Sequence, residues 1–147
     1  MKSLALLLLF FASSAFSSGP VAPDGWDGSF AGHLPSGASC CLPADLNGSG
    51  LVGGAFVLLS KDKSEFALFA LTYTPDSKEH WQLLERHPAS MLRSFRFSVV
   101  PDRRFPHGAI KSCTASGKCA YYFAPGSNAP LQRANNSFKP KPLRGSA

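Results

Sequence analysis

The sequence predicts a small, mainly β domain of antiparallel strands, fastened by disulfide bonds and carrying at most one or two short helices. Three observations lead to this prediction. The apolar runs of the central segment are short, and turn-forming residues separate them. The run SFRFSVVP alternates between apolar and polar residues, as a half-buried strand does. Four cysteines follow a leader typical of exported proteins, which indicates disulfides.

Residues 1–17 have the features of a secretory signal peptide. One lysine precedes a short apolar run, and small residues follow that run. A transmembrane helix needs about 20 apolar residues, and no run of this chain is that long, so we predict no membrane span. We therefore expect a periplasmic or secreted protein.

Composition divides the rest of the chain into three parts. Residues 18–39 are rich in Gly, Pro and Ser, and we expect an extended lead-in whose packing anchors are Trp26 and Phe30. Residues 40–124 hold the apolar runs and form the predicted antiparallel β domain. Residues 125–147 combine low hydrophobicity, repeated proline and positive charge, which predicts a flexible basic tail.

The first predicted hairpin consists of residues 54–60 and 66–74, two apolar runs on either side of the charged turn KDKSE. The next segment, EHWQLLER, admits two assignments. Its first half alternates like a strand, whereas Leu84 and Glu85 fit a helix better. HPASML then predicts a short helix with Pro88 at its first position.

Two further elements complete the predicted domain. In SFRFSVVP, Phe95 and Phe97 are expected to face the core, while Arg96 and Ser98 face solvent. GAIKSC and KCAYYFAP flank a turn-forming loop, so they predict a final hairpin.

The cysteines leave more than one pairing open. Cys113 and Cys119 bracket the turn TASGK, so a disulfide across the neck of the hairpin is one expectation. That pairing leaves Cys40 and Cys41 as an uncommon vicinal disulfide. The alternative joins both of them to the region of Cys113 and Cys119. In either case the loop CTASGKC is fastened at its base.

Charge is divided unevenly along the chain. Residues 18–85 carry three lysines against eight acids, a net charge of −5, whereas residues 86–147 carry eleven Lys and Arg against one acid, a net charge of +10. Such an asymmetry is informative about binding partners and about the rate at which they associate, and not about the fold. The alternative explanation is a solvated basic face with a basic tail.

No motif in the chain indicates catalysis. G-x-S-x-G, H-E-x-x-H, the phosphate-binding P-loop and paired C-x-x-C are all missing from the sequence, and the four histidines are scattered. We therefore predict a protein that is not an enzyme, with no catalytic residues and no cofactor. A hydrolase stays an alternative if His80, His87 or His107 lies beside a free thiol or an acid.

RSFRF and PDRRFPHGAIK interleave basic and aromatic residues, as surfaces that bind polyanions do. Because the phenylalanines of RSFRF are assigned to the core, the arginines alone are left for contact. An exported protein also meets little nucleic acid, so we predict no nucleic-acid partner. A cell-surface glycan or lipopolysaccharide is the alternative polyanion.

The candidate partner-binding site is the loop KSCTASGKC, with Ser112, Thr114, Ser116 and Lys118 as its contact residues. A disulfide at the base of the loop reduces the conformational freedom that is lost on docking, which favours binding. Hydroxyl donors on a narrow loop can enter an enzyme cleft and reach its catalytic groups. The competing interpretation is an ordinary hairpin end closed by a disulfide.

ADLNGSGLVGG, followed by two apolar runs, resembles the calcium-binding hairpin of the FG-GAP or VCBS type. Asp45 and Asn47 match ligand positions of that pattern, and Gly50 matches its turn glycine. Ser49 replaces the third acid and Gly53 the last one, which leaves one carboxylate for an ion whose affinity rises with anionic oxygens. We expect a turn in which Asp45 caps backbone N–H groups; a calcium site of Asp45, Asn47 and Ser49 is the weaker alternative.

In general character the chain is similar to periplasmic immunity proteins that neutralise the cell-wall-degrading toxins of type VI secretion systems. The similarity is one of type and not of motif. It implies an inhibitor that occludes the active site of a secreted hydrolase toxin, of the peptidoglycan amidase type. A calcium-assisted or polyanion-binding module is the alternative function. The basic half counts against this function unless the toxin presents an acidic rim, which such a partner would ideally have.

Overall fold

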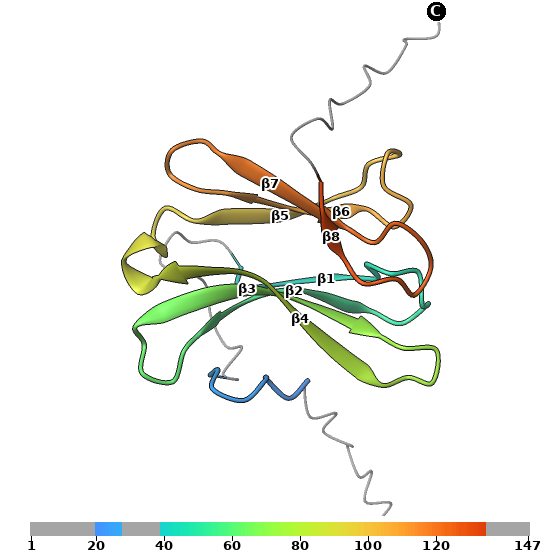
Figure 1. Ribbon diagram of the computed structural model, residues 1–147, viewed down its shortest axis with the longest axis horizontal. Coiled ribbons are helices and arrows are strands. Elements are labelled where there is room, and N and C mark those ends of the chain that lie inside the picture. Colours follow the sequence, from blue (N-terminus) through green and yellow to red (C-terminus); the bar gives the residue numbers. More distant parts are fainter. Residues whose placement is uncertain (1–19, 28–38, 135–147) are drawn as a thin grey trace, which may run out of the picture.

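The computed structural model describes residues 20–27 and 39–134; the predicted leader, Phe30 and residues 135–147 lie outside these ranges. The described chain forms two four-stranded antiparallel sheets, and Figure 1 shows them stacked face to face as a β-sandwich. The predicted fold class is therefore confirmed. Within the described ranges, no helix is long and apolar enough to cross a membrane.

Both sheets are meanders, in which each strand pairs with the next one along the chain. The first sheet comprises β1 (Cys41–Ala44), β2 (Gly53–Leu59), β3 (Glu65–Tyr73) and β4 (Glu79–Pro88). The second comprises β5 (Arg96–Val100), β6 (Ala109–Cys113), β7 (Cys119–Phe123) and β8 (Gln132–Arg133). A short 3-10 helix, η1 (Ala89–Met91), connects the two sheets.

Strand pairing confirms both predicted hairpins, which are β2–β3 and β6–β7. In β5, Phe97 is buried while Arg96 and Ser98 are exposed, as the alternation of the sequence predicts. The short helix is also present, but Pro88 ends β4 and precedes the first helical residue. Proline has no N–H to donate, which the end of an edge strand tolerates.

The segment with two open assignments, EHWQLLER, is a strand with a β-bulge. The register between β3 and β4 skips Leu84, so that Glu85 pairs with Leu68 and His87 pairs with Phe66. Leu68 and Phe66 belong to the core between the sheets. One extra residue breaks the alternation, which is why the second half of the segment fits a helix. The bulge brings Glu85 and His87 to the face that meets the second sheet.

The hydrophobic residues form two layers. The layer between the sheets draws on both of them and includes Phe66, Leu68, Phe95, Ile110 and Tyr122. A second layer covers the outer face of the first sheet and includes Phe56, Leu58, Ala67, Phe69 and Leu71. Because β2 and β3 are buried on both faces, their sequences are continuous apolar runs.

Part of the predicted lead-in closes the outer layer. The Trp26 ring packs edge-on against Phe69, with 5.2 Å between the ring centroids. The backbone N–H of Asp27 donates to the carbonyl of Leu59 at 2.8 Å, which fixes this segment along the end of β2. Trp26 is therefore confirmed as a packing anchor.

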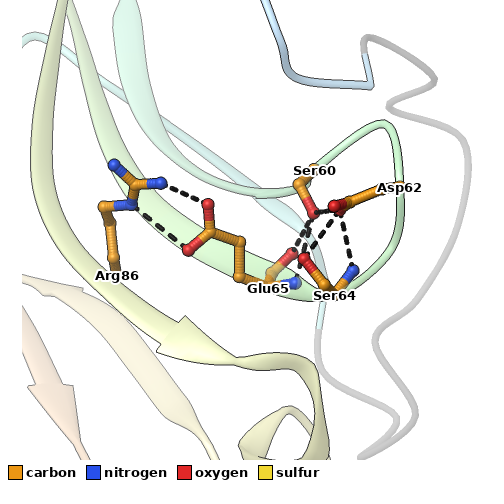
Figure 2. Close-up of polar contacts among 5 residues, drawn as sticks. All are labelled: Ser60, Asp62, Ser64, Glu65 and Arg86. Atoms are coloured by element: carbon orange, nitrogen blue, oxygen red, sulfur yellow. Dashed lines mark hydrogen bonds and ion pairs between the residues drawn. The ribbon is translucent and has the colours of Figure 1, made fainter.

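A network of short hydrogen bonds forms the turn between β2 and β3 (Figure 2). The Asp62 Oδ1 atom accepts from the hydroxyls of Ser60 and Ser64, each at 2.7 Å, and from the Ser64 backbone N–H at 3.0 Å. These bonds, the Ser60 hydroxyl foremost, lower the pKa of Asp62 to about 2. Glu65 next to the turn is paired with Arg86 of β4.

The fold continues past residue 124, where the sequence predicts a flexible tail. Leu131 is 4% exposed, and β8 pairs with β7. The side-chain amide of Gln82 binds the backbone of Leu131 twice: its nitrogen donates to the carbonyl at 2.6 Å, and its oxygen accepts from the N–H at 3.0 Å. The tail prediction is thus wrong for residues 125–134, because a side chain of β4 supplies backbone partners that no local pattern reveals.

Candidate functional site

An open pocket of about 360 Å³ lies where β4 meets β6, β7 and β8. It occupies the edge of the sandwich, next to the bulge of β4. Its lining includes Glu85, His87, Ser112, Lys118, Tyr122 and Arg133. Polar side chains from both sheets thus gather at this edge.

Glu85 is the centre of the hydrogen bonds in this pocket. Its Oε1 atom accepts from the Ser112 hydroxyl at 2.7 Å and from the Tyr122 hydroxyl at 2.8 Å. Its Oε2 atom lies 3.1 Å from His87 Nε2. Burial, and secondly the bond to Glu85, raise the pKa of Tyr122, so the phenol keeps its proton and acts as the donor.

Two cations stand at the pocket without an ion pair among the described residues: Lys118 and Arg133. Arg133 lies opposite Tyr122 in the β7–β8 register, which puts both on the face toward the first sheet. Lys118 is exposed at the end of the β6–β7 loop. The pocket therefore combines an acid at its floor with positive charge at its mouth.

The order of these groups differs from that of a nucleophile and its base. Glu85 lies between Ser112 and His87, so the imidazole is bonded to the acid and not to the hydroxyl. Nucleophilic catalysis needs the base within hydrogen-bond reach of the attacking oxygen. The histidine beside an acid that the hydrolase alternative requires is present, whereas its free thiol is not, because all four cysteines form disulfides.

The disulfides are Cys113–Cys119 and Cys40–Cys41. Of the pairings that the sequence left open, the structure thus has the one with a vicinal pair. Cys113 and Cys119 are paired residues at the neck of the β6–β7 hairpin, so their disulfide fastens its loop. The vicinal pair stands at the start of β1, in the first sheet.

The loop of residues 114–118 is held by bonds within itself. The Thr114 N–H donates to the Lys118 carbonyl at 3.0 Å, and the Gly117 N–H donates to the Thr114 carbonyl at 3.0 Å. The hydroxyls of Thr114 and Ser116 lie 2.9 Å apart. Gly117 has a φ of 80°, a conformation that favours glycine. The loop is therefore ordered before any partner arrives.

The four predicted contact residues do not form one surface. Ser112 is only 2% exposed and donates its hydroxyl to Glu85, so the prediction that it contacts a partner is wrong. Thr114 and Lys118 lie at the pocket, and Ser116 is exposed on the loop. The inward direction of Ser112 follows from its place in β6, one residue before the neck disulfide.

The predicted turn around Asp45 has the expected cap. Asp45 accepts from the backbone N–H groups of Ser49, at 3.1 Å, and Gly50, at 2.9 Å. Asn47 donates its side-chain N–H to the carbonyl of Tyr73 at 2.9 Å, which ties the turn to the end of β3. A Cβ atom at Gly53 would lie 1.9 Å from the carbonyl oxygen of Leu71, so the last ligand position of the resembled pattern has no room for a side chain.

Sequence reasoning missed Glu85, Tyr122 and Arg133 as site residues. Glu85 is 27 residues from Ser112 and 37 from Tyr122, so only the stacking of the sheets brings them together. The misfit of Leu84 and Glu85 to a strand was the one available signal, because a bulge often accompanies a functional site.

Comparisons of the chain with protein-family models, with curated proteins and with solved structures found no match.

Proposed function

We propose that this chain is an exported binding protein that inhibits a cell-wall hydrolase toxin by placing its 114–118 loop in the active site of the toxin. The proposal rests on the well-defined conformation of this loop. A disulfide at its neck and three contacts within it leave little conformational freedom to lose on docking. An exposed hydroxyl, that of Ser116, is available to a catalytic group of the partner.

Charge supports the same orientation of docking. Lys118 at the end of the loop and Arg133 beside it are both exposed and cationic. A cleft with an acidic rim would be attracted to this end of the sandwich, and electrostatic attraction raises the association rate. A peptidoglycan amidase with acidic residues around its cleft is the kind of partner that fits.

Capture and inhibition together test this proposal. The immobilised protein should retain a hydrolase from a periplasmic extract, and added protein should suppress the degradation of purified peptidoglycan by that hydrolase. Ser116→Glu should weaken inhibition at least about tenfold, because it adds a negative charge against an acidic rim.

The matched control is Ser127→Glu, at an exposed serine beyond the other end of β7. It should inhibit like the wild type. Retention of peptidoglycan or lipopolysaccharide with no hydrolase, or equal inhibition by Ser116→Glu and the wild type, would refute the proposal.

A second candidate function is binding of a cell-surface polyanion, favoured by the outer face of the second sheet. There the ammonium group of Lys111 lies 5.8 Å from the centroid of the Tyr121 ring, and Phe105 stacks on Tyr121 with centroids 6.2 Å apart. Phe105 is only 3% exposed, so the half-buried Lys111 and Tyr121 are the groups left to contact an anionic glycan. Lipopolysaccharide binding should then weaken steeply as the salt concentration rises, and it should also weaken in Lys111→Ser. If calcium assists this binding, calorimetric titration of the protein with calcium should detect the ion.

A further inference from the structure

The pocket holds an arrangement that an inhibitory loop does not need. A carboxylate side chain that is only 15% exposed stands at its floor, and at its mouth stand two cations that have no ion pair among the residues the structure describes. Opposite charges separated across a small cavity are suited to a ligand that itself carries both signs.

Glu85 has hydrogen-bonding capacity left toward the cavity. Oε1 already accepts from Ser112 and Tyr122, whereas Oε2 has His87 as its one hydrogen-bond partner among the described residues. An ionised carboxylate offers about four lone-pair sites, so Oε2 can accept one more donor. An ammonium group is the strongest donor to such an oxygen, because the bond is charge-assisted.

Lys118 and Arg133 offer the complementary half. Lys118 belongs to the fastened loop and Arg133 to β8, so both lie on elements that the fold holds in place. Arg133 can bind a carboxylate through two parallel N–H bonds, and Lys118 adds a point charge. An anionic group at the mouth would therefore meet two cations.

The size of the cavity limits the ligand. A volume of about 360 Å³ is near the lower end of the range for small-molecule sites, which is roughly 300–1,000 Å³. The cavity is open on one side, so a ligand can enter without movement of the sheets.

We propose that this pocket binds a free amino acid or short peptide in its zwitterionic form. The amino group of the ligand donates to Glu85 Oε2, and its carboxylate contacts Lys118 and Arg133. This inference does not rest on the proposed inhibition of a hydrolase, since the ligand lies in the pocket and needs no protein partner.

Titration of the full chain with alanylalanine, followed by calorimetry and by backbone amide NMR, tests the inference. Binding should shift the amide signals of Ala120 and Cys119, which line the pocket. The all-L and all-D dipeptides distinguish a ligand of protein origin from one of cell-wall origin. A C-terminal amide or an N-terminal acetyl group should each weaken binding at least about tenfold, because each removes one charged contact.

Lys118→Met and Arg133→Met should also weaken binding about tenfold or more, while Lys61→Met, at an exposed lysine of the β2–β3 turn, should leave it unchanged. These three positions are exposed, so the variants should fold normally. No shift of the pocket signals at millimolar dipeptide, or equal binding of the blocked and free dipeptides, would overturn the inference.

Discussion

Glu85 joins the two sheets through polar contacts. It belongs to β4, and its Oε1 atom accepts bonds from Ser112 of β6 and Tyr122 of β7. Such a network is stable only while its members stay paired, because an unpaired buried polar group costs more than its bond contributes. These three side chains therefore fix how the two sheets pack on one another at this edge.

Removing one hydroxyl from this network should destabilise the fold. Tyr122→Phe takes a donor from Glu85 without creating a large cavity, so the free energy of unfolding should fall by about 1–3 kcal/mol. Tyr121→Phe is the matched control, because its ring faces the outer side of the same strand. Equal midpoints of the two variants in urea would show that the Tyr122 bond contributes nothing.

Asp62 should make stability depend on pH in the acid range. Its pKa is about 2 in the folded protein against the ordinary value of 3.8, because the turn donates hydrogen bonds to the carboxylate (Figure 2). The stabilisation is complete above about pH 4 and is lost as the pH falls toward 2. Asp62→Asn should make the free energy of unfolding less dependent on pH between about 2 and 4. Glu79→Gln, at an exposed acid of β4, should leave that dependence unchanged. An unchanged slope in Asp62→Asn would contradict the assignment.

At the scale of elements, the bulge in β4 connects sequence to site. Alternation and turn residues are local signals, and they predicted the β2–β3 and β6–β7 hairpins. The bulge disturbs alternation at Leu84, so the same rules left β4 undecided. The two-residue strand β8 has no periodicity to detect, and its order comes from Gln82 across the sandwich. The bulge of β4 and the strand β8 could not be predicted, because both depend on contacts between elements that are distant in the sequence.

Gln82 should therefore control the order of the last strand. Gln82→Ala leaves the N–H and the carbonyl of Leu131 without partners, which should cost about 1–3 kcal/mol. Amide hydrogen exchange at Leu131 and Ala134, whose N–H groups bond to Gln82 and to Tyr121, should accelerate at least about tenfold, whereas exchange in β2 should change little. Gln132→Ala, at an exposed glutamine of β8, serves as the control. Equal protection at Leu131 in all three proteins would contradict this role.

The two disulfides should contribute unequally to stability. Replacing Cys113 and Cys119 by serine opens a loop with a sequence separation of six, which should cost about 2 kcal/mol in chain entropy. Replacing Cys40 and Cys41 releases almost no loop, because they are neighbours in the chain. Thermal unfolding of the two double variants compares them directly. A larger loss from the vicinal pair would contradict the entropic account.

At the scale of the whole molecule, charge is sorted by sheet. Residues 20–85 contain all eight acids of the first half against three lysines, and they form β1 to β3 and most of β4. Residues 86–134 carry eight Lys and Arg against Asp102, a net charge of +7, and they include the whole second sheet. The uneven charge of the two halves of the chain is visible in the sequence. Because each sheet is a meander of consecutive strands, each half forms its own sheet, and the charge difference becomes a difference between the two sheets. A charged partner would thus approach the sandwich from one side.

Crosslinking to the partner tests the central claim, which is contact through the 114–118 loop. A photoreactive amino acid at position 116 should crosslink to the captured hydrolase at residues lining its active-site cleft, and the same group at position 127 should not. Crosslinks of equal yield from both positions, or crosslinks from 116 to a surface remote from the cleft, would contradict the claim.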